Sequence, residues 1–255
     1  MKAVILSQND PFYTKFFFKE YIKRYSESPF ELQAVYLLDP MKDSLFGLLK
    51  RTLSFYGPFD FLRMGIKYVF AKIQEKIGVG DSPLTQLQRL GITVEKVKNV
   101  NDKAFVDIIR SYKTDFLISV SCPQIFSRDL LSTAKIAPIN IHSGKIPLYR
   151  GFFPNFWQML NGEKFATVTI HKMEPKVDKG NIILEMPIEI KPNMTLQELI
   201  KQTKEVAVEG VFEVVKRYKQ KKIILFENED LKDTYYGFPS RKDVLLFKQK
   251  GLKIL

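Results

Sequence analysis

The sequence predicts an α/β fold with a mostly parallel sheet, and the first 40 residues carry the argument. Lys2 to Leu6 is a short apolar run that ends in a polar turn, which is typical of a buried strand. Phe12 to Tyr25 begins after Pro11 and has helical spacing, and Leu32 to Leu38 is a second strand, stopped by Asp39-Pro40. Two strands around a helix indicate a βαβ unit, because parallel pairing needs a crossover of this length.

The same alternation of strands and helices continues along the chain. We expect further strands at Ile92 to Val97, Asp115 to Val120, Ala137 to Ile141, Ala166 to Met173 and Asn181 to Ile190. We expect one helix that ends at Leu90 and another that ends at Tyr112. Further helices are expected at Ser127 to Ala134, at Pro154 to Leu160 and from Thr195 to about Val215, where apolar residues recur at helical spacing.

Residues 41–77 depart from this rhythm and predict a helical insertion. The segment from Met41 to Ile77 is basic and aromatic, and it is broken at Gly57-Pro58 into two amphipathic helices. Our interpretation favours a helical layer packed on the sheet or on a second subunit over a patch on a membrane surface. A nucleic-acid role for this face is less favoured, because aromatic residues at helical spacing belong more often to a core than to a stacking platform.

Length and composition fit one domain with an appendage. The chain has 255 residues, and we divide it into a catalytic domain at 1–220, with the insertion at 41–77, and a short C-terminal extension at 221–255 that is too small to fold alone. No stretch approaches the roughly 18 apolar residues that a membrane span needs. The lone Cys122 excludes an intramolecular disulfide, so a cytoplasmic location is the expectation.

The formal charge of +12 predicts attraction to anionic partners. Nucleic acid, anionic lipid and phosphorylated small molecules all remain open on this ground. A Lys-rich surface that serves only solubility explains the charge equally well.

Three polar residues are placed to meet at one edge of the predicted sheet. Asn140 and His142 stand one residue apart at a strand exit, so in extended backbone they project to the same side. Asp178 lies in the turn Val177 to Gly180, after enough chain to return to that edge. Ligands of open α/β sheets bind outside the carboxyl ends of the strands, so the placement favours a functional site.

An amide, an imidazole and a carboxylate can together transfer an acyl group to an amine. The amide donates to the oxyanion of a tetrahedral intermediate, while the imidazole and the carboxylate handle protons. Each residue alone has an ordinary explanation: Asn140 as a turn former, His142 as a core histidine and Asp178 as a turn residue. His171 lies on a strand without an evident acidic partner, and we interpret it as structural.

The arrangement with its loop resembles the formyltransferase family, which includes methionyl-tRNA formyltransferase, glycinamide ribonucleotide formyltransferase and sugar N-formyltransferases. The resemblance is dense over Asp115 to Ile190, weaker over the N-terminal strands and absent over the insertion. It rests on Asn140-Ile141-His142, Ile146 to Gly151, Pro154, Trp157, Gly162-Glu163, Thr167 to Ile170, Met173 and Val177 to Ile183.

The resemblance implies a Rossmann-like domain and a one-carbon transferase that uses 10-formyltetrahydrofolate as donor, without a metal. It implies Asn140, His142 and Asp178 as the catalytic residues. It also implies that the pteridine lies against the loop after Val120 and near the turn that carries Asp178. The donor-binding residues implied in this sequence are Gln124, Ile125, Phe126 and Val177.

Departures from the family pattern bear on the acceptor. The family usually has Ser-Leu-Leu-Pro or a close relative after the histidine, whereas this chain has Ser143 to Pro147 with Gly144-Lys145, and the added cation suggests an anionic acceptor. The turn after the first strand lacks the glycines that cradle a phosphate in the glycinamide ribonucleotide enzymes. The chain also ends earlier than expected for the tRNA enzyme, which adds a C-terminal domain.

These points favour a small, anionic amine acceptor, namely a nucleotide-linked amino sugar. A methionyl-tRNA acceptor is the first alternative. A non-catalytic module that binds RNA or a membrane surface through the insertion is the second. Peripheral membrane contact and a homodimer stay open.

Overall fold

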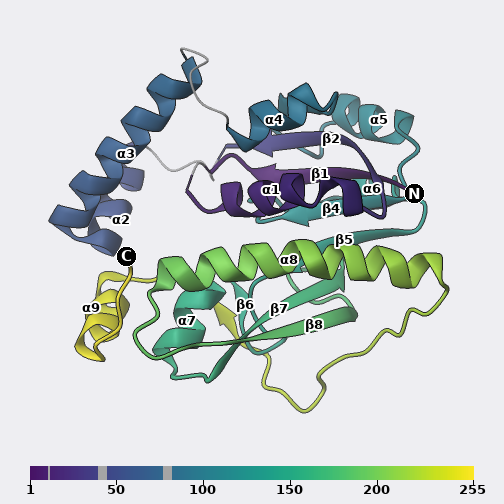
Figure 1. Ribbon diagram of the computed structural model, residues 1–255. Coiled ribbons are helices and arrows are strands. Elements are labelled where there is room, and N and C mark those ends of the chain that lie inside the picture. The colour runs from purple at the N-terminus through teal and green to yellow at the C-terminus, as the bar shows by residue number, and fades with distance from the viewer. Residues whose placement is uncertain (11, 40–44, 77–81) are drawn as a thin grey trace.

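The apolar runs of the sequence form the strands of one sheet, as Figure 1 shows. The computed structural model describes residues 1–10, 12–39, 45–76 and 82–255. Within these residues the sheet has seven strands in the order β3-β2-β1-β4-β5-β7-β8. Their bounds are β1 Lys2–Gln8, β2 Glu31–Leu38, β3 Thr93–Lys96, β4 Phe116–Val120, β5 Ala137–His142, β7 Phe165–Lys172 and β8 Ile182–Glu189. A separate parallel pair joins β6 Arg150–Gly151 to β9 Tyr235–Tyr236.

One strand of the sheet, β7, runs against the direction of the other six. The strands from β3 to β5 are parallel, whereas β7 runs antiparallel to β5 and β8 antiparallel to β7. The prediction of a mostly parallel α/β sheet is confirmed. Because the carboxyl ends of β1, β2, β4 and β5 point the same way, the loops that follow them gather at one edge.

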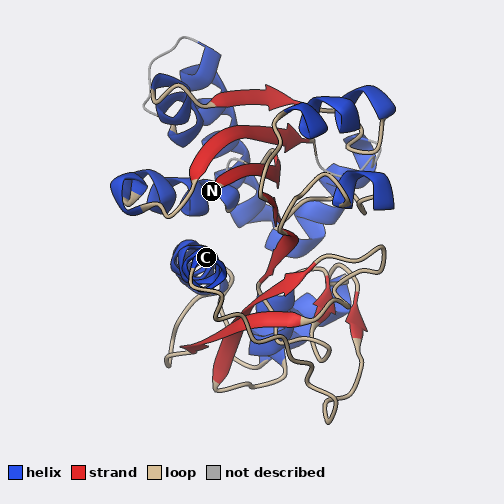
Figure 2. Ribbon diagram, turned by 90° about the vertical axis from the view of Figure 1, so that its right-hand side faces the viewer, coloured by secondary structure: helices blue, strands red, loops and turns tan. Residues whose placement is uncertain are grey.

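Helices cover both faces of the parallel strands (Figure 2). Alternate residues of β1 enter two cores: Ala3 and Ile5 join the larger one, and Val4 and Leu6 join the smaller one with α5 and α6. This two-sided burial explains why the strand reads as a continuous apolar run. The helices are α1 Thr14–Lys23, α2 Leu45–Tyr56, α3 Pro58–Lys76, α4 Pro83–Arg89, α5 Lys103–Ser111, α6 Arg128–Leu131, α7 Pro154–Leu160, α8 Leu196–Lys219 and α9 Arg241–Gln249, with a 3₁₀ turn at Tyr25–Glu27.

The long helix α8 organises the larger core. It begins at a capping box, in which the Thr195 hydroxyl accepts from the Glu198 N–H and the Glu198 carboxylate accepts from the Thr195 N–H. Its buried face contacts α1, α7, β7 and β8. The amphipathic helix expected from Thr195 is therefore present, and its apolar stripe closes the core.

The helical insertion exists, and it breaks where the sequence predicts. Gly57 adopts a φ of +80°, which favours glycine, and Pro58 opens α3. The aromatic ring of Phe55 lies 5.3 Å from Phe153 and 5.6 Å from Phe238, centroid to centroid, so α2 is anchored in an aromatic cluster. The predicted ends of the insertion, Met41 and Ile77, and most of the adjoining loop at 78–83 lie outside the described residues.

The segment after residue 220 folds back onto the rest of the chain. Strand β9 pairs with β6, and Phe247 of α9 is fully buried and stacks on Phe156 at 4.6 Å. The division into a domain at 1–220 and an extension at 221–255 stays a prediction. Packing across that boundary nevertheless joins the extension to the main core.

We expect Phe55→Ala to destabilise the protein by about 3 to 5 kcal/mol, because Phe55 is 2% exposed and its removal leaves a cavity among aromatic rings. Chemical denaturation monitored by circular dichroism measures the change. Leu53→Ala on the same helix is the control, since Leu53 is 43% exposed and should cost about 1 kcal/mol or less. Equal losses for the two variants would contradict the anchoring of α2 through Phe55.

Candidate functional site

The candidate site lies at the carboxyl edge of the sheet, where β4 and β5 end side by side. In the parallel register Ser119 pairs with Asn140 and Val120 with Ile141, so the loop after β4 begins beside the end of β5. On the other flank of β5, the antiparallel strand β7 places His171 directly opposite Asn140. Polar side chains from three elements therefore converge here.

The structure brings Asn140, His142 and Asp178 together. The Asn140 amide Nδ2 lies 3.2 Å from Asp178 Oδ1, and His142 Nδ1 lies 3.6 Å from Asp178 Oδ2. His142 is 6% exposed and Asp178 is 9% exposed, so the carboxylate meets the imidazole largely away from bulk water. The predicted convergence of the three side chains at one strand edge agrees with this geometry.

Asp178 is held by backbone groups of a constrained turn. The Gly151 N–H donates to Asp178 Oδ2 at 2.9 Å, and Asp178 itself has a φ of +49°. Gly180 follows in the same turn, where a Cβ would lie 1.8 Å from the Lys172 carbonyl oxygen, so only glycine fits. Arg150 donates from Nε to the Val177 carbonyl at 3.0 Å, which ties the turn to β6.

A carboxylate from the C-terminal segment adds a second tie to this turn. Asp233 accepts hydrogen bonds from Arg150, next to Gly151, and from Lys179, next to Asp178. The same two cations lower the pKa of Asp233, first through these hydrogen bonds. Residues far apart in the sequence therefore fix the loop that carries Asp178.

The orientation of His142 follows from a short contact to a backbone carbonyl. His142 Nε2 lies 2.6 Å from the Tyr149 carbonyl oxygen, which can only accept, so Nε2 carries the proton. In the neutral ring Nδ1 is then unprotonated and faces Asp178 Oδ2. A Cβ on Gly144 would lie 2.8 Å from the Tyr149 oxygen and 2.9 Å from His142 Nε2, so glycine at 144 preserves this contact.

Burial sets the charge state of this pair. Burial lowers the pKa of His142 below its ordinary value of 6.5, and the Asp178 carboxylate and the Tyr149 carbonyl restore it only in part. Burial also raises the pKa of Asp178, but the positive charge that His142 carries when it is protonated, the His171 ring and the Gly151 N–H outweigh this effect and hold that pKa well below 3.8. At neutral pH the site thus holds a carboxylate beside a neutral imidazole.

His171 also belongs to this cluster, so its interpretation as a histidine without an acidic partner is wrong. Its Nε2 lies 3.7 Å from Asp178 Oδ1 and 3.1 Å from Asn140 Nδ2, while its Nδ1 lies 2.8 Å from the Lys172 carbonyl. Since that carbonyl accepts the Nδ1 proton, Nε2 accepts from the amide. The two N–H groups of Asn140 are thus directed at His171 and Asp178.

A buried lysine is a second residue that the sequence interpretation missed. Lys204 of α8 is 6% exposed and donates from Nζ to Ser121 Oγ at 2.7 Å, at the start of the loop after β4. Burial lowers the pKa of Lys204 to about 8, against the opposing effect of the Asp10 carboxylate. Lys204 lies between Ile200 and Val208 on the face of α8 that points into the core. A charged residue at a core-facing position of a helix is the sequence signal that could have identified it.

The loop proposed to bind the donor is held by its own side chains. Gln124 accepts from the Val100 N–H at 2.9 Å and donates to the Lys98 carbonyl at 2.7 Å. Phe126 is buried in the smaller core, whereas Ile125 is 58% exposed. Val177, across the site, is half-buried beside Asp178. Gln124 and Phe126 therefore shape the loop, and Ile125 presents a side chain at its surface.

Neither a metal group nor a membrane span is found among the described residues. Their His, Cys, Asp and Glu side chains form no group of three or more that could hold a metal ion. Nor does any helix in this part of the chain have the length and apolarity to cross a bilayer.

Comparison with known proteins places the chain in one family. The family model described as Formyl transferase matches residues 69–215, more than half of the chain. A methionyl-tRNA formyltransferase of Chlorobium chlorochromatii is 31% identical over 150 residues, which cover 58% of this chain and 48% of the relative. The chain spans about half or less of the length of the first curated relatives that it matches.

Solved structures share this fold. A sugar N-formyltransferase from a Shewanella species has a TM-score of 0.58 and 17% identity, covering 93% of this chain and 77% of that one. An N-formyltransferase from Helicobacter canadensis in complex with folinic acid and dTDP-3-aminofucose has a TM-score of 0.54 and 16% identity, covering 95% of this chain and 72% of that one. By its sequence match over residues 69–215, the chain belongs to the formyl transferase family.

Proposed function

We propose that the protein transfers a formyl group from 10-formyltetrahydrofolate to a primary amine. The observation that carries the proposal is the convergence of Asn140, His142 and Asp178, in which Asp178 Oδ2 lies 3.6 Å from His142 Nδ1 and Asp178 Oδ1 lies 3.2 Å from the Asn140 amide. Membership of the formyl transferase family supports the reaction class.

Asn140 would stabilise the oxyanion that forms when the amine attacks the formyl carbon. Its two N–H groups are directed at His171 and Asp178 in this structure, so the formyl oxygen must take the place of one of these acceptors. The acceptor that stays in place keeps the amide oriented, so that the freed N–H points at the oxygen on which charge develops in the transition state.

His142 and Asp178 would take the proton released by the attacking nitrogen. His142 Nδ1 and Asp178 Oδ2 are two acceptors facing each other at 3.6 Å, so a proton arriving between them is shared. The Tyr149 carbonyl at Nε2 stabilises the imidazolium that results. As the C–N bond to the donor breaks, the same proton can pass to the departing nitrogen, and the transfer balances.

The residues present fit a formyl donor at this edge. A formyl group needs one hydrogen-bond donor at its oxygen and one proton acceptor near the attacking nitrogen, and Asn140 and the His142–Asp178 pair supply them. Bound 10-formyltetrahydrofolate would supply the activated formyl carbon. We propose that it lies between the loop carrying Gln124, Ile125 and Phe126 and the turn carrying Val177.

We propose a nucleotide-linked amino sugar as the acceptor. Its diphosphate would complement the charge of +12 and the partly exposed Lys145, which follows Gly144 beside His142. The Helicobacter canadensis neighbour is described in complex with such a sugar. Methionyl-tRNA is the second candidate acceptor, because several curated relatives at about one-third identity carry that activity in their names.

We expect a panel of acceptors to separate these two candidates. With 10-formyltetrahydrofolate as donor, formylation of a dTDP-linked amino sugar should exceed that of methionyl-tRNA by at least about tenfold in kcat/KM, a difference of about 1.4 kcal/mol in transition-state binding. Mass spectrometry of the products measures both rates. Faster formylation of methionyl-tRNA would reject the sugar acceptor while leaving the reaction class intact.

We expect Asn140→Ala to lower kcat by roughly 10² to 10³, the usual loss when one oxyanion donor is removed. Folinic acid should still raise the melting temperature of this variant, because the donor loop is untouched. The matched control is Asn155→Ala, which removes another small amide, bonded to Thr203 Oγ1 at 3.0 Å in the core. Full activity of Asn140→Ala would overturn its assignment.

We expect kcat/KM to be flat through neutral pH and to fall only as the pH drops below 6.5, because burial lowers the pKa of His142 from that value. Asp178→Asn removes a charge that raises this pKa, so the titration of His142 should move to still lower pH. The chain has two histidines, so ring NMR signals follow both, with His171→Gln for assignment. A pKa of His142 above 6.5 would contradict the neutral imidazole.

A further inference from the structure

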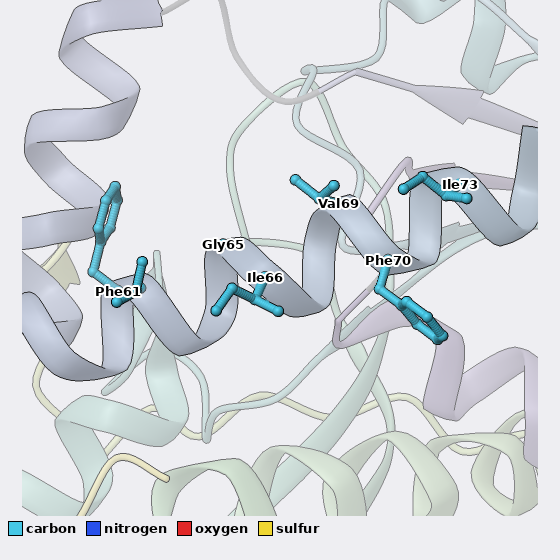
Figure 3. A pocket seen from close by; sticks show the side chains of 7 residues that line it. Phe61, Gly65, Ile66, Val69, Phe70 and Ile73 are labelled. Carbon is cyan, nitrogen blue, oxygen red and sulfur yellow. The ribbon is translucent and has the colours of Figure 1, made fainter.

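Helix α3 exposes a continuous apolar stripe that the proposed reaction does not use. Ile66, Val69, Phe70 and Ile73 project along one helix beside a shallow groove at Gly65 (Figure 3). The spacing of the stripe follows one face of a helix. Its members and their exposed fractions are Phe59 89%, Leu62 64%, Ile66 62%, Val69 56%, Phe70 61% and Ile73 50%.

A different face of α3 attaches the helix to the protein. Met64 is 3% exposed, and the Tyr68 ring lies 6.1 Å from that of Phe12, centroid to centroid. Phe61 packs against the larger core. Because this inner face already satisfies the need for burial, the outer stripe is a second apolar surface that the fold itself does not explain.

Basic side chains border the stripe. Arg63 and Lys67 are exposed on the adjoining side of α3. An apolar stripe bordered by Lys and Arg matches the charge of an anionic lipid surface.

The charge of the chain argues against a second copy as the occupant of the stripe. A second copy would bring another net charge of +12 to the contact, together with its own exposed Arg63 and Lys67. An anionic lipid surface instead adds charge attraction to the burial of the apolar side chains.

The position of α3 relates the stripe to the candidate site. The insertion follows β2, whose carboxyl end lies at the same edge of the sheet as those of β1, β4 and β5. Figure 1 shows α2 and α3 beyond that edge. A surface that α3 contacts is therefore on the side of the molecule where Asn140 and His142 lie.

We propose that α3 docks this protein onto an anionic lipid surface, with the stripe from Phe59 to Ile73 in the headgroup boundary and Arg63 and Lys67 against the lipid charges. The inference goes beyond formyl transfer and does not require it. Ile66 and Phe70 are 62% and 61% exposed, so they should carry a large share of the apolar contribution.

Sedimentation with vesicles tests the proposal on the full chain. The protein should sediment with vesicles of phosphatidylglycerol and phosphatidylcholine, and much less with phosphatidylcholine alone, and added salt should weaken the binding. Ile66→Ser with Phe70→Ser should lower the affinity at least about tenfold through lost apolar burial. Arg63→Gln with Lys67→Gln should lower it and flatten its salt dependence.

Two control pairs match these variants in kind. Ile108→Ser with Leu245→Ser changes apolar residues that are 46% and 52% exposed on other helices, and Lys216→Gln with Lys219→Gln removes two exposed charges of α8. Both should bind like the parent, and all variants should keep its melting temperature. Failure of the parent to bind anionic vesicles would overturn the proposal.

Two further results would also overturn it. One is a dimer of the parent, seen by light scattering, that Ile66→Ser with Phe70→Ser converts to a monomer. The other is RNA binding that the same variant abolishes while vesicle binding persists. A failure of lipid docking can be distinguished from a failure of formyl transfer, because the vesicle assay needs neither folate nor amine.

Discussion

The carboxylate of Asp178 is the constraint on which the site depends. A buried charge is costly unless it is hydrogen-bonded, and Asp178 receives the Gly151 N–H at 2.9 Å and an Asn140 N–H at 3.2 Å. These donors come from β6 and β5, so the carboxylate can be satisfied only when both elements are in register. Placing the carboxylate there requires a positive φ at Asp178, which strains the backbone, and it leaves room only for glycine at position 180.

Sequence reasoning reached the parts of this site that depend on local spacing. Asn140 and His142 share a side of a strand because backbone alternation places them there, and Asp178 returns to the edge because the chain between them is long enough. His171 was out of reach, since its partnership with Asn140 and Asp178 depends on the antiparallel register of β7 on β5. Lys204 stood at a core-facing helical position, but its partner Ser121 lies on a distant loop.

The insertion shows the same limit of prediction from sequence, namely that tertiary contacts cannot be inferred from local spacing. Helical periodicity predicted α2 and α3 and the break at Gly57-Pro58 correctly, but apolar residues on two faces of α3 cannot show which face packs inward. The expected packing on the main fold holds for Phe55 and Met64, which are 2% and 3% exposed, and does not extend to the stripe from Phe59 to Ile73, for which packing on a second subunit stays a prediction. Tertiary packing selects the inner face of α3, through the burial of Met64 and the contact of Tyr68 with Phe12.

One aromatic cluster connects the inserted helices to the sheet edge that carries the candidate site. Phe55 of α2 contacts Phe153 and Phe238, and those two rings lie 4.8 Å apart, centroid to centroid. Phe153 follows Gly151, the residue whose N–H holds Asp178, by two positions. Because close-packed rings leave little room for relative movement, the orientation of α2 is fixed relative to the carboxylate. A surface bound by the neighbouring α3 would therefore meet the candidate site in one defined orientation.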